Sequence, residues 1–183
     1  MQTAYLLAGF GGQGVMFAGQ LMAYAGMEHG YEVTWIPSYG PEMRGGTAHC
    51  TVILSDCPIG SPLVRHPQVV IAFNKPSAQK YAGQEDPAGL FVVNRSLVDE
   101  VPLAVQGQLV EVRATDIADQ LGNTRLTNMV LLGAALAARP VLPLAVLEAA
   151  LVAHIPAHRR GLLPLNQQAL AAGAALVSAA QPG

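Results

Sequence analysis

The glycine-rich segment GFGGQG, at residues 9–14, constrains the fold of this chain more than any other part of its sequence. It directly follows the apolar run TAYLLA, and Gly9, Gly11 and Gly14 have the G-x-G-x-x-G spacing of a dinucleotide-binding turn. In such a turn the first glycine permits a tight bend, the second lets a phosphate approach the backbone, and the third lets helix and strand pack closely. The segment therefore predicts a buried strand, a tight turn and a helix whose N-terminus can bind an anion. Close packing alone is the alternative interpretation.

Strand-like and helix-like segments alternate along the rest of the chain. A helix is predicted from Gln13 to about Glu28, ended by Gly30. Further strands are predicted at 31–36, 47–56, 68–74, 89–94 and 108–114, and further helices at 76–81, 124–139, 143–154 and 166–180, the last with Asn166 as N-cap. This alternation predicts the α/β class: a single Rossmann-like layered domain over residues 1–183, with a largely parallel sheet and helices on both faces.

The segment PSYGPEMRGG, at residues 37–46, is expected to be an irregular loop, because it holds two prolines and three glycines in ten residues. It also carries Tyr39, Glu42 and Arg44. Loops with such side chains between regular elements are frequent sites of binding and catalysis.

An NAD or FAD enzyme would need an acidic residue at the end of the second strand, to bind the ribose hydroxyls. That region reads VTWIPSYG and contains neither Asp nor Glu. Glu32 comes too early and Glu42 too late. The sequence therefore argues against a free-standing dinucleotide-binding oxidoreductase.

The composition bears on partners. Charged residues make up 12% of the chain, about half the usual share of a soluble domain. Either the surface is neutral and rich in alanine, or other subunits cover much of it. The net charge of −2 and the scattered cations, with Arg159–Arg160 as the one adjacent pair, argue against nucleic acid. No apolar run is long enough for a membrane span and no leader is evident, so a cytoplasmic location is expected.

The sequence offers no complete catalytic or metal constellation of its own. Cys50 and Cys57 are too few for a cubane iron–sulfur cluster, and both are expected to be buried thiols. The histidines lack metal-site spacing, and neither a nucleophile elbow nor a Walker-type loop occurs. No catalytic and no metal-binding residue is therefore assigned, and the chain is interpreted as part of a larger active site.

Several motifs together resemble a known family, the gamma subunits of 2-oxoacid:ferredoxin oxidoreductases. They are, in order, GFGGQGVMFAGQLMAYAG, SYGPEMRGGTAHCTVILSD, SPLV, IAFNKPSAQKY, ATDIADQLGNTRLTNMVLLGA and LNQQALAAG. The pairing of GGQG with SYGPEMRGG is far more specific than the glycine turn alone, and the sequence of these two motifs is closer to the 2-oxoglutarate type than to the pyruvate type. The resemblance implies one gamma-type domain over residues 1–183.

The resemblance also implies a reaction and an assembly. Such enzymes oxidatively decarboxylate a 2-oxoacid on thiamine diphosphate, pass electrons through iron–sulfur clusters to ferredoxin, and release acyl-CoA. Thiamine diphosphate, Mg²⁺ and the clusters would lie in partner subunits, namely alpha and beta, with a delta subunit as an open alternative. The gamma chain would hold much of the coenzyme A (CoA) site and would not be catalytic alone.

By resemblance, the CoA-binding residues lie in three segments. The backbone of the glycine turn would face CoA phosphate or pantetheine, Arg44 would bind a phosphate, and the glycines after it would keep the backbone accessible. Asn128 matches a family asparagine near the same site. The full set is Gly9, Gly11, Gly12, Gln13, Gly14, Arg44, Gly45, Gly46 and Asn128.

Alternatives remain open at each position. Arg44 could pair with Glu42 or with a partner subunit, Asn128 could cap or cross-link its helix, and Gln13 could satisfy loop carbonyls. Asn74 ends a buried strand where ligands enter such sheets, but a lone asparagine there is more often a helix cap. The whole chain could be a purely structural subunit. Within the family, branched-chain 2-oxoacid, pyruvate and indolepyruvate enzymes are alternatives to the 2-oxoglutarate type.

Overall fold

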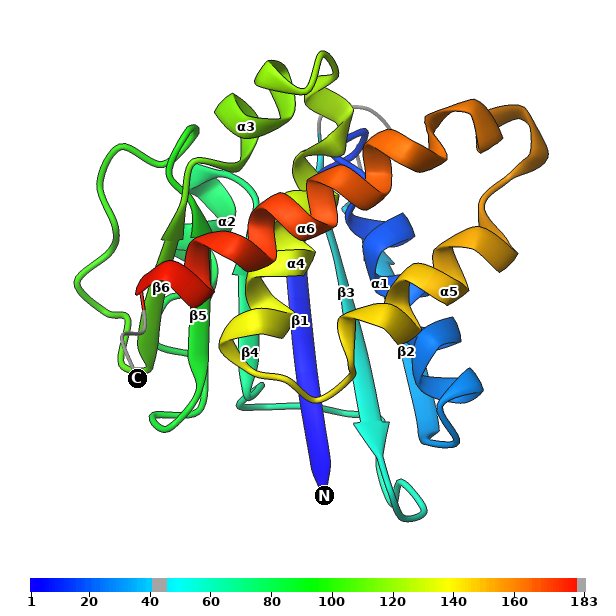
Figure 1. Ribbon diagram of the computed structural model, residues 1–183. Helices are drawn as coiled ribbons and strands as arrows, with labels where there is room; N and C mark the ends of the chain where they lie inside the picture. The colour runs from blue at the N-terminus through cyan, green and yellow to red at the C-terminus, as the bar shows by residue number, and fades with distance from the viewer. Residues whose placement is uncertain (41–45, 181–183) are drawn as a thin grey trace.

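A six-stranded sheet forms the centre of the molecule in the computed structural model, which describes residues 1–40 and 46–180 (Figure 1). Its strand order is β2-β3-β1-β4-β5-β6. The strands are β1 (Gln2–Phe10), β2 (Glu32–Tyr39), β3 (Thr47–Ser55), β4 (Val69–Ala72), β5 (Leu90–Asn94) and β6 (Gln108–Val112). All except β3 run in one direction, because β1, β4, β5 and β6 pair in parallel and β3 pairs antiparallel with both β1 and β2.

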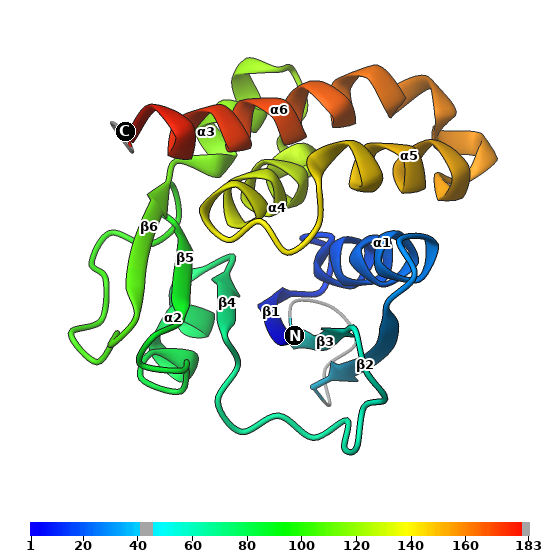
Figure 2. The same ribbon diagram turned by 60° about the horizontal axis from the view of Figure 1, so that its bottom comes forward.

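Helices cover both faces of this sheet, but unequally (Figure 2). On one face α1 (Val15–Glu28) and α4 (Thr127–Ala138) lie against the strands, with α5 (Leu144–His154) and α6 (Leu163–Ala180) outside them and α3 (Ala114–Gln120) nearby. The other face carries α2 (Lys75–Tyr81). Short 3₁₀ turns, η1 (Thr124–Leu126) and η2 (Ala157–Leu162), precede α4 and α6.

Alternation along the central strands explains the two-sided packing. In β4, Val69 and Ile71 join the main core beneath α1 and α4, whereas Val70 and Ala72 join a smaller core with Tyr81 of α2. A strand buried on both faces has no polar positions to expose, and all four residues of β4 are buried. The predicted fold class, a single α/β domain with a largely parallel sheet and helices on both faces, is confirmed.

The position of β3 in the sheet was not predicted from the sequence. The returning strand β3 is inserted between β1 and β2, so Leu7 of β1 pairs with Cys50 rather than with a residue of β2. The prediction of irregular structure from residue 37 was wrong, because β2 continues through Pro37 to Tyr39. Proline is tolerated there because β2 is an edge strand with no neighbour on its outer side.

The helices α4 and α6 pack with backbone in contact. Gly133 of α4 leaves room for the Leu170 carbonyl oxygen, which would lie 2.0 Å from an added Cβ. Gly173 of α6 does the same for the Val130 carbonyl oxygen, at 1.9 Å. The main chain of α6 therefore rests on α4, and α4 is buried on every side from Thr127 to Leu136.

Several local predictions need correction. The helix α3 was not predicted. The helix α6 begins at Leu163, so Asn166 lies in its first turn and is not the N-cap. Its Nδ2 donates to the Leu162 carbonyl oxygen (2.8 Å). Cys50 is buried as expected, but Cys57 is exposed. Asn74 is confirmed as the N-cap of α2, accepting the Ser77 N–H.

None of the described helices is long and apolar enough to cross a membrane.

Candidate functional site

The glycine turn between β1 and α1 is fixed by Gln13. Its Oε1 accepts from the Phe10 N–H (2.7 Å) and from Asn74 Nδ2 (2.8 Å), while its own N–H donates to the Phe10 carbonyl oxygen (3.1 Å). Gly9 permits this closure, because an added Cβ would lie 2.7 Å from Gln13 Oε1 and 2.9 Å from Phe73 Cβ. The side-chain oxygen of Gln13 thus holds the turn together, accepting N–H groups rather than satisfying loop carbonyls.

Gly12 and Gly14 give the turn its left-handed bends, with φ of 98° and 77°. A Cβ on Gly12 would meet nothing within 4 Å, so the backbone there is open to an approaching group. Gly14 is the N-cap residue of α1 and, among the described residues, no side chain caps this helix. First-turn N–H groups lack intrahelical partners, and the helix dipole adds positive character, so this end of α1 favours an anion.

Asn128, at the start of α4, closes over the same turn. Its side chain is 5% exposed and its Nδ2 donates to the Gly14 carbonyl oxygen at 3.2 Å. Its Oδ1 accepts from the Met129 N–H at 2.9 Å. The side chain therefore cross-links α4 to the turn, in agreement with the cross-linking alternative.

The predicted loop returns to the turn at Gly46, whose carbonyl oxygen accepts from the Gly11 N–H at 3.1 Å. Two members of the predicted set, Arg44 and Gly45, lie outside the described residues, as does Glu42. The structure thus brings together Gly9, Gly11, Gly12, Gln13, Gly14, Gly46 and Asn128.

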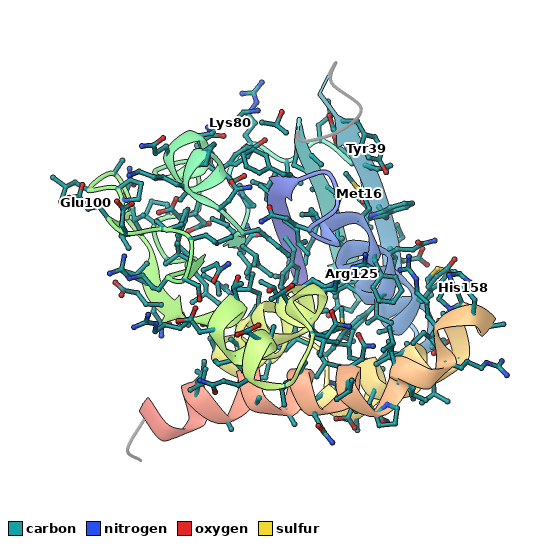
Figure 3. The ribbon with its side chains drawn as sticks, turned by 90° about the horizontal axis from the view of Figure 1, so that it is seen from above. Met16, Tyr39, Lys80, Glu100, Arg125 and His158 are labelled. Carbon is teal, nitrogen blue, oxygen red and sulfur yellow. The ribbon has the colours of Figure 1, made fainter. Side chains whose placement is uncertain are left out.

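Two cavities open on the glycine turn, and Arg125, which is labelled in Figure 3, lines both. The larger has a volume of about 340 Å³ and lies between the turn, the α4 start and the η2 segment. It is lined by Gly12, Gly14, Phe17, Asn123, Arg125, Leu126, Asn128, Ile155, Arg159, Leu162 and Asn166. The smaller, of about 230 Å³, is lined by Gly12, Gln13, Leu97, Thr115, Thr124, Arg125 and Thr127. Gly12 and Arg125 are common to both.

The charged side chains that line these cavities, among the residues that the structure describes, are both cationic. Arg125 and Arg159 line the larger cavity, and no Asp or Glu of the described residues lines either one. Neither arginine forms an ion pair within the described part of the chain. Guanidinium groups bind phosphates in a bidentate manner, so the lining suits a phosphorylated ligand with an apolar portion against Phe17 and Leu162.

Sequence reasoning missed both arginines. Arg125 lies in GNTRLTN, in the first turn of the helix predicted over 124–139, and its charge was not considered. Arg159 belongs to the one adjacent pair of cations, which was weighed only against nucleic acid. The signal that could have found Arg125 is its position between the end of β6 and the long helix. Ligands of open α/β sheets bind beyond the carboxyl ends of the strands, where such connections lie.

Among the described residues, no three His, Cys, Asp or Glu side chains gather closely enough to hold a metal ion. The cavities therefore offer cations, amides and hydroxyls rather than metal ligands. Such a lining binds and orients a ligand, and it contains no evident nucleophile or general base.

Comparison with known proteins places this arrangement in a family. The sequence model described as pyruvate ferredoxin/flavodoxin oxidoreductase matches residues 4–176. This chain belongs to that oxidoreductase family. The 2-oxoglutarate synthase subunit KorC of Methanothermobacter marburgensis is 31% identical, over 99% of this chain and all of that subunit.

Other members of the family are longer. The ketoisovalerate oxidoreductase subunit VorA of the same organism is 38% identical over 131 residues, which cover 72% of this chain and 27% of VorA. The chain thus spans about a quarter of the length of the VorA relatives. The gamma subunit of a keto/oxoacid ferredoxin oxidoreductase from Geobacter sulfurreducens superposes with a TM-score of 0.83 at 27% identity, over 97% of this chain and 99% of that one.

A 2-oxoglutarate:ferredoxin oxidoreductase from Magnetococcus marinus, solved with 2-oxoglutarate, coenzyme A and succinyl-CoA bound, shares the fold. Its TM-score is 0.86 at 24% identity, over all of this chain and 32% of that one. At 24% identity this match supports a shared fold and nothing further.

Proposed function

We propose that this chain is the gamma-type subunit of a 2-oxoacid:ferredoxin oxidoreductase and forms part of its CoA site. The proposed reaction converts a 2-oxoacid, CoA and oxidised ferredoxin into acyl-CoA, carbon dioxide and reduced ferredoxin. With 2-oxoglutarate as substrate the product would be succinyl-CoA. Thiamine diphosphate, Mg²⁺ and the iron–sulfur clusters would be held by the alpha and beta partners, and ferredoxin would meet the complex rather than this chain.

The observation that carries this proposal is the pair of cavities on the glycine turn, lined by Arg125 and Arg159, which form no ion pair with any other described residue. CoA combines three phosphate groups, an adenine and a long neutral arm. The arginines would bind phosphates, the open backbone at Gly12 would let a phosphate approach, and the apolar wall would take the adenine. Arg44, within the family loop that ends beside Gly11, would add a further cation.

The chain's own contribution to catalysis would be placement. Holding the CoA thiol near an acyl group formed in a partner subunit converts an encounter between two molecules into a reaction within one complex. Gln13 and Asn128 would act through the backbone, because their side chains hold the turn rather than facing solvent.

The test is kinetic and uses the assembled complex. In the variants Arg125→Ala and Arg159→Ala the KM for CoA should rise about tenfold or more, because each loses a charge-assisted hydrogen bond, while the KM for the 2-oxoacid stays unchanged. Arg160→Ala is the matched control, since Arg160 is exposed beside Arg159 and does not line the cavity. Unchanged CoA kinetics in both variants, with loss of assembly instead, would favour a purely structural subunit.

The 2-oxoacid needs a separate test, because VorA relatives share 38–39% identity with this chain while KorC relatives match over more of its length. The complex should be assayed with 2-oxoglutarate, the branched-chain 2-oxoacid 3-methyl-2-oxobutanoate, pyruvate and indolepyruvate. We expect the highest kcat/KM for 2-oxoglutarate. A higher value for 3-methyl-2-oxobutanoate would reassign the complex to the branched-chain type.

A further inference from the structure

His154, the last residue of α5, makes two contacts with α1 that the CoA site does not use directly. Its ring stacks on Tyr24, with centroids 3.9 Å apart and planes 12° from parallel. Its Nε2 lies 2.6 Å from Glu28 Oε1. One side chain thus joins the end of α5 to the third and fourth turns of α1 by a ring contact and a polar contact.

The residues that follow His154 form one wall of the larger cavity. Ile155 is buried and lines that cavity, and η2 carries Arg159 and Leu162 into it. The opposite wall belongs to the start of α1, through Gly14 and Phe17. Because α1 is one continuous helix, the contacts of His154 with its far end fix the distance between the two walls.

Little else of a directional kind ties these segments together. Among the described residues, His154–Glu28 is the only hydrogen bond between α1 and residues 144–162. A hollow of about 200 Å³ lies under the contact, lined by Phe17, Gln20, Leu21, Tyr24, His154 and Pro156. Packing is thus incomplete directly beneath the contact, although Leu147, Leu151 and Ile155 anchor α5 in the main core. Such apolar contacts are not directional, whereas the His154–Glu28 contact is.

We propose that His154, through Tyr24 and Glu28, positions η2 and with it Arg159 relative to the glycine turn. This inference rests on the proposed function, since the ligand it serves is CoA. His154 is a positioning residue: it touches no ligand and acts by holding the Arg159 side chain at the right distance from Gly12 and Gly14.

The contact should matter more for binding than for stability. The side chains of His154 and Glu28 are 32% and 43% exposed, and ion pairs at such places contribute little to folding. A small displacement of Arg159, in contrast, weakens a hydrogen bond whose strength falls steeply with distance and angle. Loss of His154 should therefore raise the KM for CoA with little change in the unfolding temperature.

The experiment uses the assembled complex with four variants. His154→Ala removes both contacts, His154→Phe keeps a ring for Tyr24 but loses the polar contact, and Glu28→Gln keeps an oxygen acceptor without its charge. His158→Ala is the control, because His158 is an exposed residue of η2 outside the cavity lining. For His154→Ala we expect the KM for CoA to rise about three- to tenfold, with kcat and the KM for the 2-oxoacid within about twofold.

Hydrogen exchange provides a readout that does not depend on CoA. Amides of residues 155–162 should exchange faster in His154→Ala than in the parent complex, less so in His154→Phe and Glu28→Gln, and at the parent rate in His158→Ala. Unchanged exchange together with an unchanged KM in His154→Ala would overturn the proposal.

The double variant His154→Ala/Arg159→Ala separates this inference from the function on which it rests. If His154 acts through Arg159, the double variant should have nearly the KM of Arg159→Ala, whereas fully multiplicative effects would refute that route. If Arg159→Ala itself leaves the KM unchanged, the proposed function of the cavity fails, while faster exchange of residues 155–162 would still identify His154 as the residue that holds η2.

Discussion

Asn128 donates its Nδ2 to the carbonyl oxygen of Gly14 at 3.2 Å, so the start of α4 is hydrogen-bonded to the N-cap residue of α1. The two residues are 114 positions apart in the chain. The N-terminus of α1 is therefore held by α4, which is buried from Thr127 to Leu136, and a change at either residue should alter the position of the other.

Asn128→Asp tests this brace. The substitution keeps the size of the side chain but replaces the Nδ2 donor with a second oxygen, which would face the Gly14 carbonyl. Because the group is buried, we expect the free energy of unfolding to fall by about 2–3 kcal/mol, measured by urea denaturation. Asn123→Asp is the control: Asn123 accepts the Arg125 N–H, which Asp can also do, so its stability should stay near the parent value.

Gly14→Ala and Gly12→Ala should differ, although both residues have positive φ. An alanine at position 12 meets open space and should lose only the cost of the left-handed backbone, about 1–2 kcal/mol. At position 14 the new Cβ would also lie 2.5 Å from Asn128 Nδ2. Gly14→Ala should therefore have the lower unfolding temperature of the two variants. Equal unfolding temperatures would mean that the Asn128 side chain moves aside without loss of stability.

Gly133→Ala should strongly destabilise the domain. Its Cβ would lie 2.0 Å from a backbone oxygen of α6, and backbone cannot move aside as a flexible side chain can. We expect a loss of at least about 2–3 kcal/mol, seen as a lower midpoint in urea. Gly161→Ala, where an added Cβ meets nothing, should unfold within about 0.5 kcal/mol of the parent.

The two thiols should react differently. Burial raises the pKa of Cys50 to about 12, so its thiol stays protonated and shielded at pH 8, whereas Cys57 is exposed. A thiol reagent at that pH should label one cysteine of the native chain and two after denaturation. Cys57→Ser should abolish the native reaction, and rapid native labelling of that variant would contradict the buried state of Cys50.

The glycine spacing and the alternation of elements were enough to predict the α/β fold, the β1–turn–α1 unit and the capping role of Asn74. The last two rest on local chemistry, namely backbone freedom at glycine and a side chain that caps the next helix. The insertion of β3 was not predictable in the same way. The apolar pattern of TAHCTVILSD predicts a strand but not its neighbours, which depend on packing over the whole sheet.

The candidate site was likewise predictable only where its residues are close together in the sequence. Gly9 to Gly14 form the predicted turn, and Gly46 lies beside it, whereas the binding of CoA by these residues stays a prediction. Arg159 could not be found by such reasoning, because it reaches the cavity only through the path of α5 and η2 around α1. The roles of Arg44 and Gly45 stay predictions.

The place of β3 between β1 and β2 also bears on how the chain is made. Tyr5 in β1 pairs with Val52 on one side and Val69 on the other, so β1 gains its first partner when β3 has left the ribosome and its second only when β4 follows. Until β3 emerges, α1 also lacks the β3 side chains against which it packs. Unpaired apolar strands promote aggregation, so the nascent chain is most exposed to this hazard until synthesis has passed β4.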